Sequence, residues 1–421
     1  MVHTDAVEKY MMRQDSNLRV GTGLCAGGCY IYVVALSTTA YWFFVSLIPV
    51  YNKHFFQKEY FPYPIATAGI QLGVVGLLLV VLNASQHLIR ASLGFSTESW
   101  VFGPHIWWKL KAVFPIGFLF GLKYGVTNLG LHLVPAPIHL LLQSTDLIWT
   151  IIGAWWINGE SVSKVGLLCV SGCIAGSIVL SIQVDETVKA PMLAIAVNLL
   201  SPVLLGLCIA TLRSACVELM RKDNRVQGSV SSVELTALKL IISSFVAIIL
   251  ACVFDNQKEG LHHHVTWWAK FGSLSTSTKL GVLGGSLPIL AFQVNCTFLT
   301  GLTSAVSVGL VGQLKIIPQW IMALLFAPNV NFHLEPWNIA GALLSIMSAG
   351  AFAINNWMEY SRNKRERSLS NASLPDGTDS TDSTVPEDLD GLLTNESVRL
   401  LEGPVSTYAT QSIGYHAIDI I

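Results

Sequence analysis

Five charged side chains interrupt runs of apolar residues in this sequence: Lys123, Asp146, Arg213, Lys239 and Lys315. A charged side chain at the centre of a lipid bilayer costs about 2.5–3.5 kcal/mol or more, so charges found there usually serve a function. Arginine can hold a phosphate through two parallel N–H groups, whereas lysine attracts it as a point charge. Lys123, Arg213 and Lys315 therefore predict a site for an organic anion. Asp146 predicts a counter-charge for a lysine, or a partner for a ribose hydroxyl.

Uncharged polar side chains near these charges extend the predicted site. They are Tyr124, Asn128, Gln143 and Gln313. An amide group can recognise a hydroxyl or a base edge, and the tyrosine ring can stack on a nucleobase. The alternative for the amides is a hydrogen bond between helices, which is common in membranes and modest in energy.

Two other interpretations of the charges stay open at this point. Asp146 and Lys315 can form a permanent ion pair, because removing one partner of such a pair is costly even when forming it gains little. Lys239 lies near one end of its apolar run, where a lysine can extend to the headgroups. Glu234 precedes it by five residues, outside the spacings that pair side chains on a helix, so a substrate role for Lys239 is not excluded.

The segments that carry these residues have the composition of a membrane protein. The chain has 421 residues, of which 52% are hydrophobic and 12% charged, whereas soluble proteins have about 25% charged residues. Apolar runs of about 20 residues cross a bilayer, and lipid requires them to be helical. We predict an all-α polytopic membrane protein with ten transmembrane helices near 29–51, 62–83, 113–132, 135–157, 165–183, 190–212, 234–254, 280–299, 302–326 and 337–357.

The ten predicted spans divide into two sets of five, after a polar N-terminal segment at 1–28. Residues 29–183 form the first predicted five-helix repeat and residues 190–357 the second. A unit with an odd number of spans points in opposite directions when it is duplicated, which predicts inverted repeats. When the fourth span is aligned with the ninth, Asp146 and Lys315 occupy equivalent positions. Lys and Arg are more frequent in the short loops on the side of the termini, which predicts that both termini are cytosolic.

Short motifs in spans 1–9 resemble those of a known transporter group. They are Asn52-Lys53, Phe61-Pro62-Tyr63-Pro64, Thr127-Asn128, Gly159-Glu160, Leu212-Arg213-Ser214, Thr303-Ser304-Ala305 and Gly312-x-Leu314-Lys315. Their order and spacing resemble the triose-phosphate translocator and nucleotide-sugar transporter families of the drug/metabolite transporter superfamily. The resemblance implies two inverted five-helix halves that work by alternating access. It also implies antiport of phosphorylated metabolites or nucleotide sugars, with Lys315 and Arg213 at family positions.

Residues 361–421 have a different composition, rich in Ser, Thr, Asp and Asn, which predicts a disordered cytosolic tail. Two acidic dileucine patterns and a tyrosine-based pattern in this tail resemble sorting signals, which predicts binding to clathrin adaptors. Their defining residues are Leu392, Leu393, Leu400, Leu401, Tyr415 and Ile418. These signals favour an endolysosomal location, whereas the family resemblance implies the Golgi or the endoplasmic reticulum. We therefore expect a multi-pass endomembrane protein.

Other functional classes have little support in the sequence. The i,i+4 cysteine pairs lack a neighbouring His or carboxylate, so we expect no metal site and no cofactor. No nucleophile–base set and no basic groove-binding pattern is present, which argues against an enzyme and against nucleic acid as a partner. The expected partners are an organic anion and the lipid bilayer, with a homodimer as an open oligomeric state. Two alternatives are an exporter of an amine or amino-acid-like solute that uses Asp146, and a non-transporting adaptor that acts through its tail.

Overall fold

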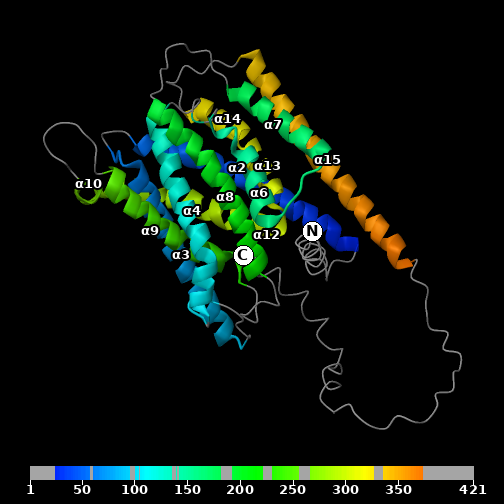
Figure 1. The fold of residues 1–421 in the computed structure, drawn as a ribbon. Coiled ribbons are helices and arrows are strands. Elements are labelled where there is room, and N and C mark those ends of the chain that lie inside the picture. Colours follow the sequence, from blue (N-terminus) through cyan, green and yellow to red (C-terminus); the bar gives the residue numbers. More distant parts are fainter. Residues whose placement is uncertain are drawn as a thin grey trace, which may run out of the picture. The chain divides into compact units, whose positions relative to one another are not determined.

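Helices form all the regular structure in the described part of the chain. The structure is a computed structural model, and it describes residues 24–56, 60–94, 100–103, 105–134, 139, 142–181, 192–220, 230–255, 266–326 and 335–372 (Figure 1). No strand occurs among these residues, which confirms the predicted helical class. The predicted sorting residues, from Leu392 to Ile418, lie outside the described ranges.

The helix bounds are as follows, in chain order over the described residues. They are α2 (Leu24–Phe55), α3 (Pro64–Ser92), α4 (Ile106–Leu133), α6 (Asp146–Asn158), α7 (Lys164–Ser181), α8 (Met192–Leu219), α9 (Ser232–Phe254), α10 (Trp267–Ser273), α11 (Thr276–Gly284), α12 (Ser286–Leu302), α13 (Ala305–Leu314), α14 (Ile316–Phe326) and α15 (Pro336–Ala372).

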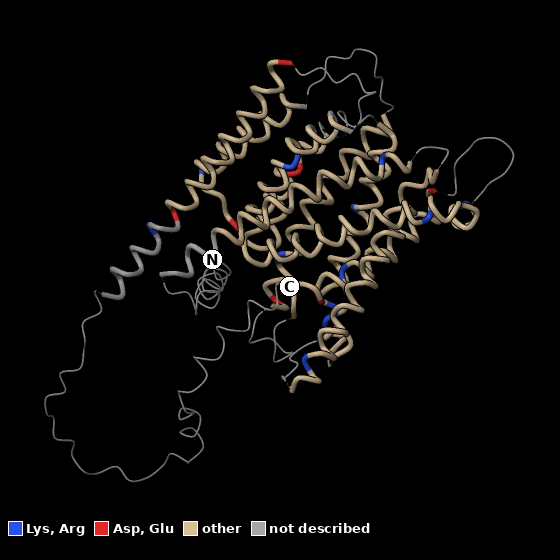
Figure 2. The backbone as a smooth tube through the Cα atoms, turned by 180° about the vertical axis from the view of Figure 1, so that it is seen from behind, with Lys and Arg blue, Asp and Glu red and all other residues tan. Residues whose placement is uncertain are grey.

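Long apolar helices with few charges support the membrane assignment. In the described residues, seven segments are long and apolar enough to cross a bilayer: α2, α3, α4, α8, α9, the continuous stretch of α11 and α12, and α15. Figure 2 shows Lys, Arg, Asp and Glu as isolated positions along helices of other residues. Large apolar side chains face outward, as Leu77 and Val81 do on α3, whereas buried polar side chains face inward. The predicted count of ten spans stays a prediction, because α6, α7, α13 and α14 are shorter.

Glycines allow the central helices to approach one another closely. α9 lies against both α3 and α4. A Cβ atom at Gly69 of α3 would lie 2.8 Å from the side chain of Ile248, and one at Gly117 of α4 would lie 2.6 Å from Ile242. α7 and α15 make a similar contact, where a Cβ at Gly176 would lie 2.6 Å from the carbonyl oxygen of Gly341 (Figure 1). Small residues at such crossings are typical of membrane helices, which associate through close packing.

Two of the predicted spans are interrupted near their charged residues. The ninth span consists of α13, which ends at Leu314, and α14, which begins at Ile316. Pro318 explains the break, because a proline has no N–H to donate to the carbonyl four residues earlier and its ring clashes with that group. In the fourth span, residues 144 and 145 form a turn and α6 begins at Asp146. The chain therefore places Asp146 and Lys315 at helix ends rather than inside continuous helices.

Several helix boundaries differ from the sequence prediction, and two of the differences change how a segment is interpreted. α4 begins at Ile106 instead of near residue 113, which brings Lys109 into the helix. α15 continues to Ala372, so residues 361–372 are helical although they belong to the tail predicted to be disordered. The stretch contains several Arg, Lys and Glu residues, which are strong helix formers and extend the helix beyond its apolar part.

Candidate substrate-binding site

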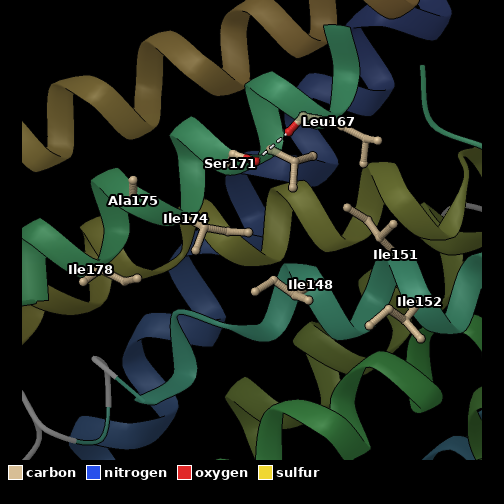
Figure 3. A pocket seen from close by; sticks show the side chains of 9 residues that line it. Ile148, Ile151, Ile152, Leu167, Ser171, Ile174, Ala175 and Ile178 are labelled. Carbon is tan, nitrogen blue, oxygen red and sulfur yellow. Dashed lines mark hydrogen bonds between the residues drawn. The ribbon is translucent and has the colours of Figure 1, made fainter. Parts of the chain in front are cut away.

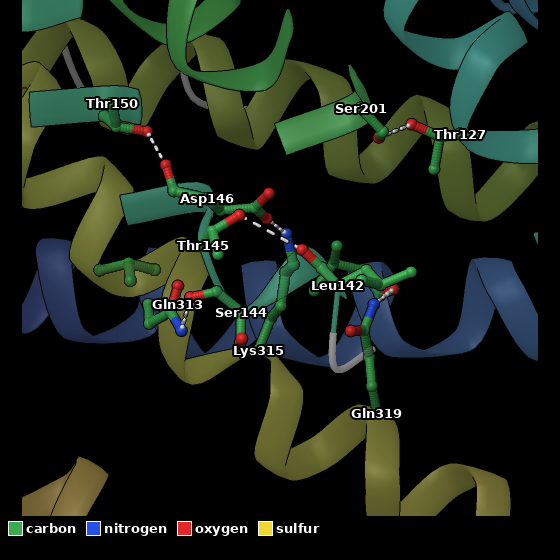
Figure 4. A network of polar contacts seen from close by, with 12 residues as sticks. Thr127, Leu142, Ser144, Thr145, Asp146, Thr150, Ser201, Gln313, Lys315 and Gln319 are labelled. Carbon is green, nitrogen blue, oxygen red and sulfur yellow. Dashed lines mark hydrogen bonds and ion pairs between the residues drawn. The ribbon is translucent and has the colours of Figure 1, made fainter. Parts of the chain in front are cut away.

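An ion pair between Lys315 and Asp146 forms the centre of the site (Figure 4). The amine of Lys315 contacts Oδ2 of Asp146, and the two side chains are 8% and 3% exposed. Asp146 is the first residue of α6, and Lys315 is the C-cap of α13. A helix N-terminus favours a negative charge and a C-terminus a positive one, so the start of α6 favours the charge of Asp146. The end of α13 favours the charge of Lys315, whereas the start of α14 opposes it. The structure thus brings together two residues that the sequence placed at equivalent depths.

Each residue of the ion pair is preceded in the chain by a buried glutamine, Gln143 before Asp146 and Gln313 before Lys315. Nε2 of Gln313 donates to the carbonyl of Ser144 at 2.8 Å, which joins α13 to the turn before α6 (Figure 4). Gln143 and Gln313 are both buried, with exposures of 4% and 0%. Among the described residues, Nε2 of Gln143, Oε1 of Gln313 and Oδ1 of Asp146 have no hydrogen-bond partner. Buried polar atoms are nearly always paired, so three unpaired atoms on or within three residues of the ion pair indicate a position for water or a ligand.

A second group of polar side chains comes from α4 and α12. The amine of Lys123 lies 4.4 Å from the centre of the Tyr124 ring, in a cation–π contact. Gln293 donates through Nε2 to the hydroxyl of Tyr124, and its Oε1 atom is another buried atom without a partner. Lys123 is close enough to Lys315 and Asp146 for the charges to interact. Lys123 and Tyr124 therefore border the same polar region as the ion pair.

The helix α2 covers this region with aromatic side chains. Tyr41 is 3% exposed, and its hydroxyl lies 3.4 Å from the place of a Cβ on Gly312. Trp42 donates through Nε1 to the carbonyl of Val311 at 2.9 Å. The sequence makes Tyr41 a candidate for stacking on a nucleobase, with packing inside its apolar run as the alternative. Tyr41 and Gly312 are far apart in the sequence, so the sequence alone does not predict this contact.

Arg213 and Asn128 have other partners in the structure. Nη1 of Arg213 donates to the carbonyls of Thr300 and Gly301, at 3.0 Å each, near the end of α12. Nδ2 of Asn128 donates to the carbonyl of Pro64 at 3.1 Å. Neither side chain contacts the Lys315–Asp146 pair in the described interactions. A substrate role for these two residues stays a prediction.

A second buried ion pair was missed by sequence reasoning. Nζ of Lys109 lies 2.6 Å from Oε1 of Glu234, with the two side chains 1% and 0% exposed. Lys109 also donates to the carbonyl of Trp100 at 3.0 Å. Lys109 precedes the apolar run that marks span 3, so its position in the sequence predicts a charge outside the membrane. Ser231 caps α9 by accepting from the N–H of Glu234, which gives the Ser-x-x-Glu signature of a helix start.

A groove of about 400 Å³ between α6 and α7 lies apart from these charges (Figure 3). Isoleucines from both helices line most of it, and Ile148 and Ile152 are 39% and 46% exposed. Its one hydroxyl, on Ser171, donates to the carbonyl of Leu167 at 3.0 Å. A groove without a charged lining does not suit an organic anion, whereas exposed apolar side chains on membrane helices suit lipid.

The described residues contain no group of three His, Cys, Asp or Glu side chains that could hold a metal ion.

No family model matches the chain, and no curated protein matches it. One solved structure, titled "Crystal structure of protein", is 14% identical to the chain. It aligns over 76% of this chain and 95% of that chain, with a TM-score of 0.49.

Proposed function

We propose that this protein is a secondary-active transporter that exchanges an organic anion by alternating access. The substrate class is a nucleotide sugar or a phosphorylated metabolite, and the membrane is an endomembrane. The observation that carries the proposal is the Lys315–Asp146 pair, which lies at two helix interruptions. Asp146 and the nearby residues Gln143 and Gln313 have buried polar atoms without a partner in the described part of the chain. Transporter sites commonly use such interrupted helices, whose ends provide partial charges for ions and anionic groups.

The ends of the half-helices support an anionic substrate. α14 begins at Ile316, directly after Lys315, so the positive end of its dipole lies next to the lysine. A helix N-terminus together with a lysine is a favourable site for a phosphate or carboxylate. In the empty protein, Asp146 takes the place of that anion. Substrate binding would release Asp146 from Lys315, which links occupancy of the site to a change in the contact between α6 and α13.

Ten spans in two inverted repeats are part of the proposal. The seven long apolar segments become ten when α7 and the interrupted fourth and ninth spans are added. Lys53, near the end of the first span, donates to the carbonyls of Leu131 and Val134 at 2.6 and 3.2 Å, at the end of the third. Arg213, toward the end of the sixth span, donates in the same way to the end of the eighth. Equivalent basic caps at equivalent helix ends support the repeat. The proposed orientation, with both termini in the cytosol, rests on the Lys and Arg residues of the short loops.

Exchange in liposomes tests the proposed function. The full-length protein is reconstituted and loaded with one member of a panel of nucleotide sugars, nucleotides and sugar phosphates, and uptake of the labelled compound is followed. We expect exchange of at least one panel member, and we expect Lys315→Ala to abolish it while the protein remains folded. Lys111→Ala is the matched control, because Lys111 is an exposed lysine on α4. Exchange by Lys315→Ala at the wild-type rate would contradict the role of Lys315.

The unpaired Oδ1 atom of Asp146 favours one second candidate, an exporter of an amine. In that case Asp146 would bind the positively charged substrate, and Lys315 would serve only to hold it in place. Asp146→Asn would then reduce transport of amines more than Lys315→Ala does. Exchange of anions by the wild-type protein, lost in Lys315→Ala, would rule out this candidate.

A further inference from the structure

Lys239 on α9 is a buried amine with few partners. Its side chain is 0% exposed, and Nζ donates one hydrogen bond, to Oγ1 of Thr297 at 3.1 Å. The amine also lies 4.5 Å from the centre of the Phe120 ring. No carboxylate among the described residues pairs with it, and Glu234, the acid on its own helix, is bonded to Lys109. A buried charge without a counter-ion is costly, so this residue needs an explanation.

The surroundings of Lys239 continue into those of Lys123. The rings of Phe120 and Tyr124 are stacked on one face of α4, with centroids 5.9 Å apart. Lys239 lies over the first ring and Lys123 over the second. The two amines are therefore linked by one pair of aromatic rings, although they come from different helices.

The charges in this region do not balance. The thiol of Cys296 is close enough to interact electrostatically with the amines of Lys123, Lys239 and Lys315. Asp146 is the one carboxylate paired with any of these amines among the described residues. When the amines are protonated, the region around Cys296 holds three positive charges, and among the described residues only that of Lys315 is paired with a carboxylate. A region of low dielectric with this excess favours a ligand that brings at least two negative charges.

We propose that Lys239 is a second anion-binding residue of the same site and that the substrate carries at least two negative charges. One anionic group binds at Lys315 and Lys123, and a second binds at Lys239. Two phosphoryl groups, or a phosphoryl group and a carboxylate, meet this requirement. The inference rests on the proposed transport function and narrows its substrate class. A compound with a single negative charge leaves Lys239 without a counter-ion.

The substitution Lys239→Met distinguishes a binding role of Lys239 from a structural one. If Lys239 binds a ligand, its charge has no counter-ion in the ligand-free protein. Lys239→Met then stabilises the ligand-free protein, because methionine fills a similar volume without a desolvation penalty. Thr297 tolerates the loss, since its hydroxyl still accepts from Thr236 at 2.8 Å and donates to the carbonyl of Gln293 at 3.0 Å. If Lys239 instead supports the fold, the same substitution destabilises the protein.

The first experiment measures the melting temperature of the empty, full-length protein in detergent. We expect Lys239→Met to raise Tm by about 2 °C, and Lys111→Met, the exposed lysine of α4, to leave it unchanged. A lower Tm for Lys239→Met, or a variant that does not fold, would overturn the proposal by making Lys239 structural. This readout is independent of transport, so it stands apart from the test of Lys315 by exchange.

The second experiment compares inorganic pyrophosphate with inorganic phosphate as probes of the same site. We expect pyrophosphate to raise the Tm of the wild type and of Lys111→Met more than phosphate does, because a ligand that binds the folded state stabilises it. Lys239→Met should lose this difference, and Lys239→Arg should retain it. Two results would overturn the proposal of a second subsite. One is a Lys239→Met protein that keeps the full difference between the Tm shifts with pyrophosphate and phosphate, and the other is a wild type whose Tm shifts equally with both. Failure of Lys315→Ala to affect exchange would instead count against the proposed function itself.

Discussion

The two buried ion pairs of this protein differ in how completely their atoms are paired. Lys109 and Glu234 are almost inaccessible, lie inside or at the start of regular helices, and have further partners such as the carbonyl of Trp100. Lys315 and Asp146 are buried to a similar degree but lie at helix interruptions. Oδ1 of Asp146 and neighbouring amide atoms have no partner in the described structure. An ion pair whose hydrogen-bonding atoms all have partners (a saturated pair) can only hold helices together. An ion pair with atoms that have no partner (an unsaturated pair) can exchange one partner for a ligand.

The largest expected effect comes from removing one partner of the saturated pair. Lys109→Met leaves the Glu234 charge buried without a counter-ion, so we expect the free energy of unfolding to fall by about 3–5 kcal/mol. Thermal unfolding of the purified variant in detergent measures this loss. The double variant Lys109→Met/Glu234→Leu serves as the control, because it removes both charges. Recovery of most of the stability in the double variant is expected, and a single variant as stable as the wild type would contradict the structural role.

The corresponding change in the unsaturated pair should affect transport more than stability. Lys315→Met leaves Asp146 at the N-terminus of α6, where the helix dipole partly compensates its charge. We expect exchange in liposomes to fall by about 100-fold, which corresponds to the loss of a strong hydrogen bond to a charged group. Tm in detergent should decrease less than it does for Lys109→Met. The opposite ranking, with greater destabilisation by Lys315→Met, would make this pair structural as well.

Removing either basic cap at a helix end should reduce stability by a similar amount, which is smaller than the loss for Lys109→Met. Lys53→Gln and Arg213→Gln each remove charged hydrogen bonds to terminal carbonyls of α4 and α12. We expect each to lower the free energy of unfolding by about 1–3 kcal/mol, as measured by thermal unfolding. A loss of exchange without a change in stability for Arg213→Gln would instead support the predicted contact between Arg213 and the substrate.

The smallest expected effect is that of a single amide beside the ion pair. Gln313→Leu removes the hydrogen bond to Ser144 and the unpaired Oε1 atom. One hydrogen bond contributes about 0.5–1.5 kcal/mol, so we expect the KM for exchange to rise by about 2- to 10-fold. Gln319→Leu is the matched control, because Gln319 donates to the carbonyl of Val45 rather than to the turn before α6. Equal effects of both substitutions would argue against a specific role for Gln313.

Residue types and positions along the chain were enough to predict part of this site. The cost of a charge in lipid identified Asp146 and Lys315, and alignment of the fourth and ninth spans placed them at equivalent positions. The interruption of the ninth span follows from Pro318, whose missing N–H marks the end of α13 at Leu314.

Other features depend on contacts that a single sequence does not encode locally. Lys109 precedes an apolar run and was interpreted as a charge outside the membrane, although a partner 125 positions away buries it. Tyr41 approaches Gly312, which lies on a helix far away in the sequence. Each of these outcomes was decided by how helices pack across the bundle, so composition and periodicity gave no signal for them.

A charge swap tests the central claim most directly. The double variant Asp146→Lys/Lys315→Asp keeps a pair of opposite charges but moves the positive charge from the C-terminus of α13 to the N-terminus of α6. Exchange of labelled anions by this variant in liposomes is compared with that of the wild type and of Lys111→Ala. If Lys315 binds the anionic substrate, the swapped protein reaches the membrane folded and does not exchange anions. Exchange at the wild-type rate would contradict the account, because it would reduce Lys315 and Asp146 to an ion pair that only holds the helices together.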